Sequence, residues 1–444
     1  MLKTFRIGGI HPPENKWSAN QSVSVLAIPK QVVIPLSQHI GAPAEAVVRK
    51  GDSVKVGTLL AKAGGFISAN IHSSVSGTVS KIDQAIDASG RQRPAIFIDV
   101  EGDEWENSID RSEKLKKECE LSAKEIIDKV AAAGVVGMGG ATFPTQVKLS
   151  PPPGNKAEIL IINGVECEPS LTSDHSLMLE KGEQILTGVT ILMKAIQVNK
   201  AVIGIENNKP DAIAHLTKLA AGYQGIEVMP LKVQYPQGGE KQLIDAIAGK
   251  QVKSGALPIS VGAVVQNVGT VYAVYEAVQK NKPLIERIVT VTGKAVAKPS
   301  NFLVRIGTPV RELVEAAGGL PEATGKIIGG GPMMGKALIS TDIPITKGSS
   351  GILLIPQKDA ERKPVYDCIR CAKCVTVCPM GLNPTYLMTT TEFAKWDLAE
   401  RNYIADCIEC GSCSYTCPAN RPLLDYIRSG KGKVMGLINA RKSK

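Results

Sequence analysis

Aromatic residues and long apolar runs are both scarce in this sequence of 444 residues. Aromatic side chains make up 4% of the chain, whereas 43 glycines and 27 prolines favour many tight loops. No apolar run reaches the roughly 18 residues that a membrane-spanning helix needs. The segment Met1–Ile10 also lacks the continuous apolar core of a signal peptide. We therefore expect a protein that has no transmembrane segment of its own and stays in the cytoplasm.

Histidine is rare, and cysteine is nearly absent outside one short stretch. The five histidines are dispersed, and none pairs with another at a metal-ligand spacing. Cys119 and Cys167 stand alone, whereas the other eight cysteines lie between Cys368 and Cys417. Disulfides would be spread across a secreted domain, whereas metal ligands come in tight clusters. The cysteines therefore indicate a metal site in a reducing compartment.

Acidic residues are outnumbered by basic ones, and the net charge is +10 at pH 7. A basic balance can suit nucleic acid, an anionic membrane surface or an acidic protein. Because no nucleic-acid motif is present, we expect no nucleic-acid partner. Basic residues also gather near the C-terminus, where a solvated, disordered tail and a docking role are both open. They are Arg428, Lys431, Lys433, Arg441, Lys442 and Lys444.

The spacing of apolar residues and turns divides the chain into four parts. Residues 1–117 alternate short apolar runs with Gly, Pro and Ser turns, which indicates β structure followed by a charged linker. Residues 118–285 alternate strands with helices, which predicts a parallel sheet with helices on its faces. Residues 286–359 return to β character, and residues 360–444 hold the clustered cysteines between short helices.

Individual elements can be predicted from apolar periodicity. The expected strands are Ile159–Ile162, Ala201–Ile205, Gly225–Met229 and Arg287–Thr292. The expected helices run over about 174–195, 210–221, 240–248, 308–317 and 382–398. The last of these helices would brace the cysteine-rich region.

Two runs of four cysteines, each followed by proline, have the spacing CxxCxxCxxxCP. They are Cys368, Cys371, Cys374 and Cys378, and Cys407, Cys410, Cys413 and Cys417. In this pattern three thiolates lie on one tight loop and bind one 4Fe–4S cluster, while the fourth ligates the other cluster. We therefore assign Cys417 to the cluster of Cys368, Cys371 and Cys374, and Cys378 to the cluster of Cys407, Cys410 and Cys413. Structural zinc is the alternative, but zinc sites usually pair CxxC units over longer spacings.

A glycine-rich segment, GVVGMGGATFPTQVKL at residues 134–149, can bring its backbone close to a ligand. Its N–H groups suit a phosphate, and Lys148 adds a positive charge. The expected strand Ile159–Ile162 is followed by Asn163 and Glu166, at the strand end where ligands usually bind in α/β sheets. The structural alternatives are an ordinary glycine turn and a capped turn in which Asp174 is the N-cap.

These motifs resemble those of the NADH-binding flavoprotein subunit of respiratory complex I. GMGGATFPTQVK resembles its flavin loop, INGVECEP its second flavin motif and QNVGT at 266–270 its third, and YPQGGEK at 235–241 matches its Gly-Glu loop. Met138, Gly164 and Val165 depart from complex I, and paired clusters replace its single terminal cluster. The departures, the opening FRIGGIHPPENK and the segment GGGPMMG resemble a sister family, the C subunit of the Rnf ion-translocating complex. The resemblance covers nearly the whole chain.

The resemblance implies a set of site residues. Non-covalent FMN would be held by Gly137, Gly139, Gly140, Lys148, Asn163, Glu166, Asn267 and Thr270. The substrate NAD(H) would face Phe143, Glu168, Gly239 and Glu240, of which Glu168 and Glu240 are the candidates for a catalytic role. Cys119 and Cys167 are expected to be ordinary residues, and lining the flavin site is the one role open to Cys167.

The resemblance also implies a multidomain α/β fold. Residues 1–117 would form a barrel-sandwich domain of the biotinyl/lipoyl type with a linker, and residues 118–285 a Rossmann-like FMN/NADH-binding domain. Residues 286–359 would form a β-grasp ligand-binding module, and residues 360–444 a helical ferredoxin-like domain with two clusters. Counted back without gaps from the Ser-Gly pair of the barrel, Phe66 occupies the position of the modified lysine, so we expect a structural barrel.

The resemblance implies a peripheral subunit on the cytoplasmic face of the cell membrane. It would exchange electrons between NADH, FMN and two 4Fe–4S clusters. Ferredoxin-like and membrane subunits would be its partners in a ferredoxin:NAD oxidoreductase that moves Na⁺ or H⁺. Two alternatives stay open, a cobalamin reductase of a microcompartment and a non-enzymatic electron relay without nucleotide binding. A complex I flavoprotein is disfavoured by the eight-cysteine region.

Overall fold

The computed structural model describes residues 2–442. Its centre is a parallel sheet with the strand order β11-β10-β9-β12. The strands are β9 (Ile159–Asn163), β10 (Ala201–Glu206), β11 (Ile226–Leu231) and β12 (Ala263–Asn267). All six residues of β10 are buried, as expected for a central strand that is covered on both faces. The predicted parallel sheet is thus confirmed.

Helices cover both faces of this sheet because alternate strand residues point to opposite sides. Ile161, Val202 and Val265 pack against α6, whereas Leu160, Ile203 and Val264 face α4 and α7. The helices of this part are α1 (Ala123–Ala132), α2 (Thr145–Lys148), α3 (Ser173–Glu180), α4 (Gly182–Ile196), α5 (Pro210–Ala220), α6 (Glu240–Ala248) and α7 (Val268–Gln279).

The single helix expected over residues 174–195 is wrong. The chain forms α3 and α4 instead, because Lys181 between them leaves the helical region with φ −127° and ψ 31°. Gly182 then starts α4 where α5 crosses closely, since a Cβ at this position would lie 2.8 Å from His215 Nε2. The break coincides with this close crossing of α4 and α5, a contact that local periodicity does not encode.

The N-terminal part contains two small sheets, β2-β8-β7-β4 and β3-β5-β6. Their strands are β2 (Gln31–Pro35), β3 (Glu45–Ala46), β4 (Ser53–Val54), β5 (Leu59–Lys62), β6 (Ile71–His72), β7 (Gly77–Ile86) and β8 (Gln92–Val100). Val32, Ile34 and Ile96 are fully buried in one core between them. The residues before β2 lie outside these sheets. Ile10 pairs with Tyr235, and β1 (Ser24–Val25) pairs with β14.

Residues 286–356 form most of a six-stranded sheet with the order β1-β14-β13-β17-β15-β16. The strands are β13 (Glu286–Thr292), β14 (Ser300–Arg305), β15 (Thr324–Gly329), β16 (Lys336–Ala337) and β17 (Gly351–Pro356). The helix expected over residues 308–317 is α8 (Val310–Ala316), and a short helix, α9 (Gln357–Ala360), follows the sheet. The expected mixture of strands and a helix is confirmed.

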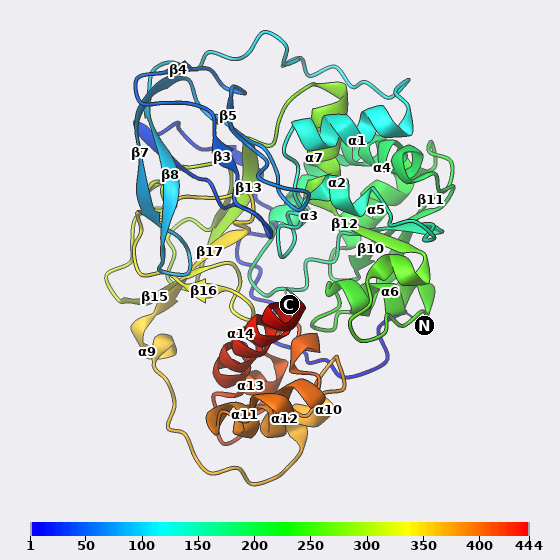
Figure 1. The fold of residues 1–444 in the computed structure, drawn as a ribbon, viewed down its shortest axis with the longest axis vertical. Helices are drawn as coiled ribbons and strands as arrows, with labels where there is room; N and C mark the ends of the chain where they lie inside the picture. The colour runs from blue at the N-terminus through cyan, green and yellow to red at the C-terminus, as the bar shows by residue number, and fades with distance from the viewer. Residues whose placement is uncertain (1, 443–444) are drawn as a thin grey trace.

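An extended segment, residues 361–372, leads to the C-terminal helices, which gather in one bundle (Figure 1). They are α10 (Lys373–Thr376), α11 (Pro384–Glu392), α12 (Trp396–Arg401), α13 (Ser412–Thr416) and α14 (Leu423–Lys442). The single helix expected over residues 382–398 is wrong, because Ala394 takes a left-handed conformation with φ 50° between α11 and α12.

The basic C-terminal region is helical up to Lys442, because it forms most of α14. Leu424, Ile427 and Val434 of this helix are buried against the bundle, so a disordered tail is excluded for these residues. Lys444 lies outside the described residues. No helix within residues 2–442 is long and apolar enough to cross a membrane.

Candidate functional site

The carboxyl ends of β9 and β12 bring two predicted site residues side by side. Asn163 and Asn267 end these neighbouring strands and are paired in the sheet register. Asn267 also caps α7, since its Oδ1 accepts a hydrogen bond of 2.8 Å from Gly269 N. Asn163 Nδ2 donates a hydrogen bond of 2.8 Å to Gly238 O, the residue before Gly239. Three of the sequence motifs therefore meet at one edge of the sheet: INGVECEP, QNVGT and YPQGGEK.

The glycine-rich loop lies against this edge. Gly137 N donates to Phe143 O at 2.9 Å, and Met138 N donates to Thr270 Oγ1 at 2.9 Å. Thr270 is fully buried, so its hydroxyl accepts this hydrogen bond from the interior of the protein and holds the loop in place. Gly139 and Gly140 are exposed, yet a Cβ at Gly139 would lie 2.7 Å from Asn267 Nδ2, whereas one at Gly140 would meet nothing within 4 Å. Gly139 is therefore required for the loop to approach Asn267.

Glu166 fixes the start of α3 with its carboxylate. Its Oε1 accepts hydrogen bonds from Asp174 N at 2.8 Å and Ser173 Oγ at 3.3 Å, and its Oε2 accepts one from His175 N at 3.2 Å. An anionic carboxylate is favourable at a helix N-terminus. The alternative with Asp174 as N-cap is wrong, because Thr172 precedes the helix and Asp174 lies in its first turn.

Two buried charged groups that sequence reasoning did not assign to the site lie beside these residues. Asp174 Oδ2 accepts a hydrogen bond of 2.7 Å from Asn267 Nδ2. Burial, and then the negative charge of Glu166, raise the pKa of Asp174 to about 7. Arg287 of β13 is buried and donates to Lys347 O and, at 3.5 Å, to Met138 O. Burial lowers the pKa of Arg287 to about 10, so it stays cationic at neutral pH.

Lys148 at the end of α2 and Glu240 at the start of α6 form an ion pair. Lys148 Nζ lies 2.6 Å from Glu240 Oε1 and also donates to Val265 O at 3.2 Å. Gly239 is the N-cap of α6, and Glu240 is its first residue. Phe143 is half-buried beside the loop. The predicted flavin residue Lys148 and the predicted nucleotide residue Glu240 therefore belong to one site.

Glu168 is directed toward a different part of the chain. Its Oε1 accepts hydrogen bonds from Met333 N at 2.7 Å and Met334 N at 2.8 Å, within the GGGPMMG segment. Burial raises the pKa of this carboxyl, although the two N–H groups oppose the shift. The acidic loop, which follows β9 and carries Glu166 and Glu168, is thus attached to the domain of the six-stranded sheet.

Lys16 holds the same acidic loop from the N-terminal segment, and sequence reasoning missed it. Its ammonium donates to the backbone oxygens of Glu166 at 3.0 Å, Glu168 at 3.0 Å and Leu171 at 2.6 Å. Burial lowers its pKa. No local pattern could have revealed this role, because Lys16 is about 150 residues away in sequence.

The residues present fit a phosphate-bearing flavin. Backbone at Gly139 and Gly140 is accessible, and Lys148 supplies a cation beside β12, where it bonds Val265 O. The Nε2 atom of Gln266, next to Asn267, is buried and has no hydrogen-bond partner within the described residues. An unpartnered buried donor at the carboxyl end of a strand suits a polar ligand. Cys167, expected beside the flavin, accepts a hydrogen bond of 3.3 Å from Gly238 N.

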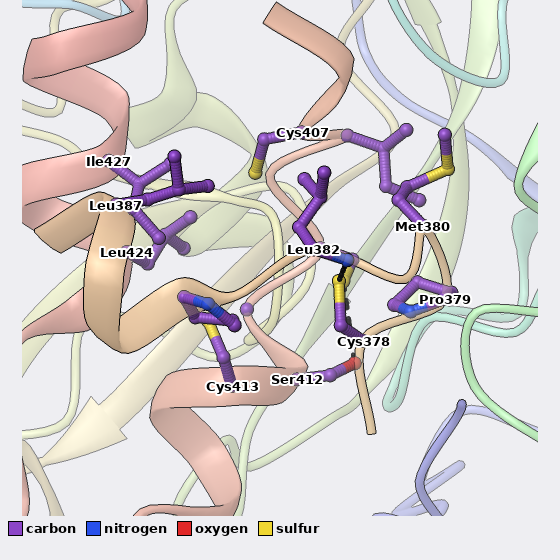
Figure 2. A pocket seen from close by; sticks show the side chains of 14 residues that line it. Cys378, Pro379, Met380, Leu382, Leu387, Cys407, Ser412, Cys413, Leu424 and Ile427 are labelled. Atoms are coloured by element: carbon purple, nitrogen blue, oxygen red, sulfur yellow. Dashed lines mark hydrogen bonds between the residues drawn. The ribbon is translucent and has the colours of Figure 1, made fainter. Parts of the chain in front are cut away.

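One hollow in the helical bundle is lined by four of the predicted ligands, Cys378, Cys407, Cys410 and Cys413. Figure 2 shows Cys378, Cys407 and Cys413 around it, together with the apolar side chains of Leu382, Leu387, Leu424 and Ile427. Burial, first among the causes, raises the pKa of Cys407 to about 11 and that of Cys413 to about 12. Such thiols become thiolates at neutral pH when a metal binds them.

The remaining four cysteines do not line this hollow. Cys374 and Cys417 pack around Met388 and Leu423, whereas Cys368 and Cys371 are exposed on the extended segment. Within residues 2–442, no three His, Cys, Asp or Glu side chains are drawn together around a single metal ion. A cubane spaces its ligands more widely than one tetrahedral zinc ion, whose sulfurs lie about 2.3 Å from a common point.

Four family models match successive parts of the chain. Residues 3–103 match the RnfC barrel sandwich hybrid domain, and residues 130–276 match the Nuo51 FMN-binding domain. Residues 288–337 match the SLBB domain, and residues 361–418 match a 4Fe-4S dicluster domain. The predicted arrangement of a barrel-sandwich, a flavin-binding and a two-cluster domain is therefore confirmed, with an SLBB domain between the last two.

Curated relatives are similar over most of their length. The C subunit of the proton-translocating ferredoxin:NAD(+) oxidoreductase complex of Clostridium ljungdahlii is 49% identical over 87% of this chain and 84% of its own. The C subunit of the Na(+)-translocating complex of Acetobacterium woodii is 44% identical over 97% of both chains. An NAD+-reducing [NiFe]-hydrogenase has a similar fold, with a TM-score of 0.51 and 21% identity over 70% of this chain and 62% of that chain.

Proposed function

Because the chain belongs to the family of C subunits of ion-translocating ferredoxin:NAD oxidoreductase complexes, we propose that it is the peripheral electron-exchange subunit of such a complex. It exchanges electrons between NADH, FMN and two 4Fe–4S clusters, and the whole complex couples this reaction to Na⁺ or H⁺ translocation. The observation that carries the proposal is the meeting of the glycine-rich loop, Asn163 and Asn267 at one sheet edge.

When bound, FMN and the two clusters would supply the redox chemistry that links NADH, a two-electron donor, to one-electron carriers. The protein residues bind and orient these groups. Gly139 and Gly140 offer backbone N–H groups to the FMN phosphate, and Lys148 supplies a positive charge. Gly137, whose N–H bonds Phe143 O, holds the loop in shape beside the FMN. Asn163, Glu166, Asn267 and Thr270 complete the FMN site. Their hydrogen bonds to the surrounding backbone and side chains keep the site rigid before FMN binds.

NADH binds next to FMN, against Phe143, Glu168, Gly239 and Glu240. The ion pair of Lys148 with Glu240 supports this proposal, since it links the phosphate side of the site to the first turn of α6. Glu240 orients the nucleotide through hydrogen bonds to its hydroxyl or amide groups. Glu168 contributes from the loop after β9. Its carboxylate accepts hydrogen bonds from Met333 N and Met334 N, and these bonds fix that loop.

Cys368, Cys371, Cys374 and Cys417 ligate one cluster, and Cys378, Cys407, Cys410 and Cys413 ligate the other. The common hollow of the second set supports this crossed arrangement. In finer terms, we propose a Rossmann-like flavin domain, a β-grasp SLBB module and a ferredoxin-like cluster domain. The protein attaches to the cytoplasmic face of the membrane through ferredoxin-like and membrane subunits, and its positive charge assists this attachment.

Anaerobic purification followed by iron, sulfide, flavin and NADH-reduction assays tests the proposal. We expect about eight irons and eight labile sulfides per chain, from two Cys-ligated cubanes. We also expect one FMN, which NADH bleaches. A cluster-containing protein whose flavin does not respond to NADH would instead be an electron relay without nucleotide binding, and zinc in place of iron would contradict the cluster assignment.

A further inference from the structure

Tyr235 lies between the flavin part of the chain and the cysteine-rich bundle. It follows β11 and precedes Gly239 and Glu240 by a few residues. Its side chain is 2% exposed. Its backbone is fixed by two hydrogen bonds with Ile10, each of 2.9 Å, from the N–H of either residue to the oxygen of the other. The ring therefore has a fixed position inside the protein.

The hydroxyl of Tyr235 donates a buried hydrogen bond of 2.8 Å to the backbone oxygen of Cys410. The same ring packs in a small cluster with Ile10, Cys410 and Cys167. Cys167 in turn accepts the hydrogen bond from Gly238 N, and Gly238 O accepts the one from Asn163. A continuous series of contacts thus runs from the sheet edge that carries Asn163 to the cysteine loop at residues 407–413.

The other contacts between the flavin side and the bundle reach the same cysteine set. Gln242 of α6 donates a hydrogen bond of 3.0 Å to the oxygen of Pro379, which follows Cys378. Gly9 N donates to Val377 O at 2.9 Å. Cys368 and Cys371, in contrast, are exposed. The two predicted clusters are therefore not equivalent in their relation to the flavin side.

We infer that Tyr235 is a positioning residue that fixes the cluster of Cys378, Cys407, Cys410 and Cys413 against the flavin domain and raises the reduction potential of that cluster. The inference rests on the proposed function. The hydrogen bond goes to the backbone oxygen of Cys410, so the positive end of the O–H dipole lies beside a ligand residue of the cluster and favours the more negative, reduced form. Fixed spacing between redox centres also matters, because small displacements of supporting residues have large effects on rates. This cluster is then the first to exchange an electron with the flavin.

The variant Tyr235→Phe keeps the ring packing and removes the hydroxyl that bonds Cys410. We expect iron and flavin contents equal to those of the unaltered protein. In EPR-monitored electrochemical titrations of the anaerobic full-length protein, the signal that Cys410→Ser abolishes should shift to a lower potential. The signal that Cys371→Ser abolishes should not move. The matched control is Tyr275→Phe, which removes another buried hydroxyl that accepts a hydrogen bond from Lys116 N in the flavin domain.

A second variant, Tyr235→Leu, also removes the ring. We expect electron transfer onward to a soluble one-electron acceptor to fall several-fold relative to the rate at which NADH bleaches the flavin of the same variant. An unmoved potential for the Cys410-dependent signal in Tyr235→Phe, or a shift of the Cys371-dependent signal instead, would overturn the inference. Because the titration needs no NADH, an unaltered protein that fails to react with NADH would contradict the proposed function and leave this test intact.

Discussion

Asp174 and Asn267 are joined by a 2.7 Å hydrogen bond from the amide of Asn267 to the carboxyl of Asp174, inside the predicted flavin site. Both side chains come from the starts of helices that follow the sheet edge, one in α3 and one before α7. The amide also stands against Gly139 of the glycine-rich loop. A change in the charge of Asp174 should therefore affect the geometry of the whole site.

The first prediction concerns pH. Burial and the charge of Glu166 raise the pKa of Asp174 from 3.8 to about 7, so the folded protein holds this proton more tightly than the unfolded chain. The stability that Asp174 contributes is then complete below pH 4 and is lost as the pH rises through about 7. Asp174→Asn should remove this part of the pH dependence, which amounts to a few kcal/mol in order of magnitude. Unfolding of the flavin-loaded protein at several pH values measures it. The prediction would be contradicted if the free energy of unfolding changed with pH in the same way in both proteins.

The second prediction compares two adjacent glycines. Gly139→Val should expel FMN, because a Cβ here would lie within 2.9 Å of three side-chain atoms of Asn267. Gly139→Ala should weaken FMN binding for the same reason, whereas Gly140→Ala should retain it, since a Cβ there meets nothing within 4 Å. Flavin content after gel filtration distinguishes the variants. Full flavin retention in Gly139→Val would refute the assignment of the loop.

The third prediction concerns crossed ligation. Cys378→Ser should damage the same cluster as Cys407→Ser, because both residues line one hollow. Cys417→Ser should behave like Cys371→Ser. NADH should still bleach the flavin in all four variants, since the nucleotide site lies in another part of the chain. EPR spectra of the reduced proteins decide the matter, and local ligation would be established if Cys378→Ser and Cys371→Ser perturb the same signal.

The fourth prediction concerns the pair of Lys148 and Glu240. Glu240→Gln should raise the KM for NADH about tenfold or more, as expected for the loss of a hydrogen bond to a charged group, and should leave iron and FMN contents unchanged. The control is Lys250→Met, which breaks another ion pair of the same domain, with Glu158 at 2.5 Å, on the exposed surface. Exposed ion pairs contribute little, so steady-state kinetics of this control should match those of the unaltered protein. Equal KM values in both variants would remove Glu240 from the nucleotide site.

The fifth prediction concerns the barrel-sandwich domain. Phe66 is 75% exposed at the position where related barrels carry a modified lysine. A phenyl ring has no amine to form an amide with biotin or lipoate, so we expect neither group on the protein. Intact mass spectrometry tests this, and a mass increase equal to either group, mapped to Lys62 or elsewhere in the barrel, would show the prediction to be wrong.

The sequence determined those features that depend on short-range spacing. Apolar runs predicted three strands of the parallel sheet, β9, β10 and β11, but not β12. They also predicted the helix over residues 240–248, and the CxxCxxCxxxCP runs predicted two sets of cluster ligands. In these cases the periodicity of a strand or helix, or the reach of a tight loop, already restricts the structure.

Only the tertiary structure decided how distant residues combine. It directs Glu168 toward Met333 and Met334, places Arg287 beside the glycine-rich loop and lets Lys16 hold the acidic loop. It also divides the long helix expected over residues 174–195 and joins Tyr235 to Cys410. The hydrogen bonds of Glu168, Arg287, Lys16 and Tyr235 each join residues more than a hundred positions apart. Buried polar groups need hydrogen-bond partners, and the packing of the whole chain decides which groups are near enough. Local sequence patterns carry no record of such partners.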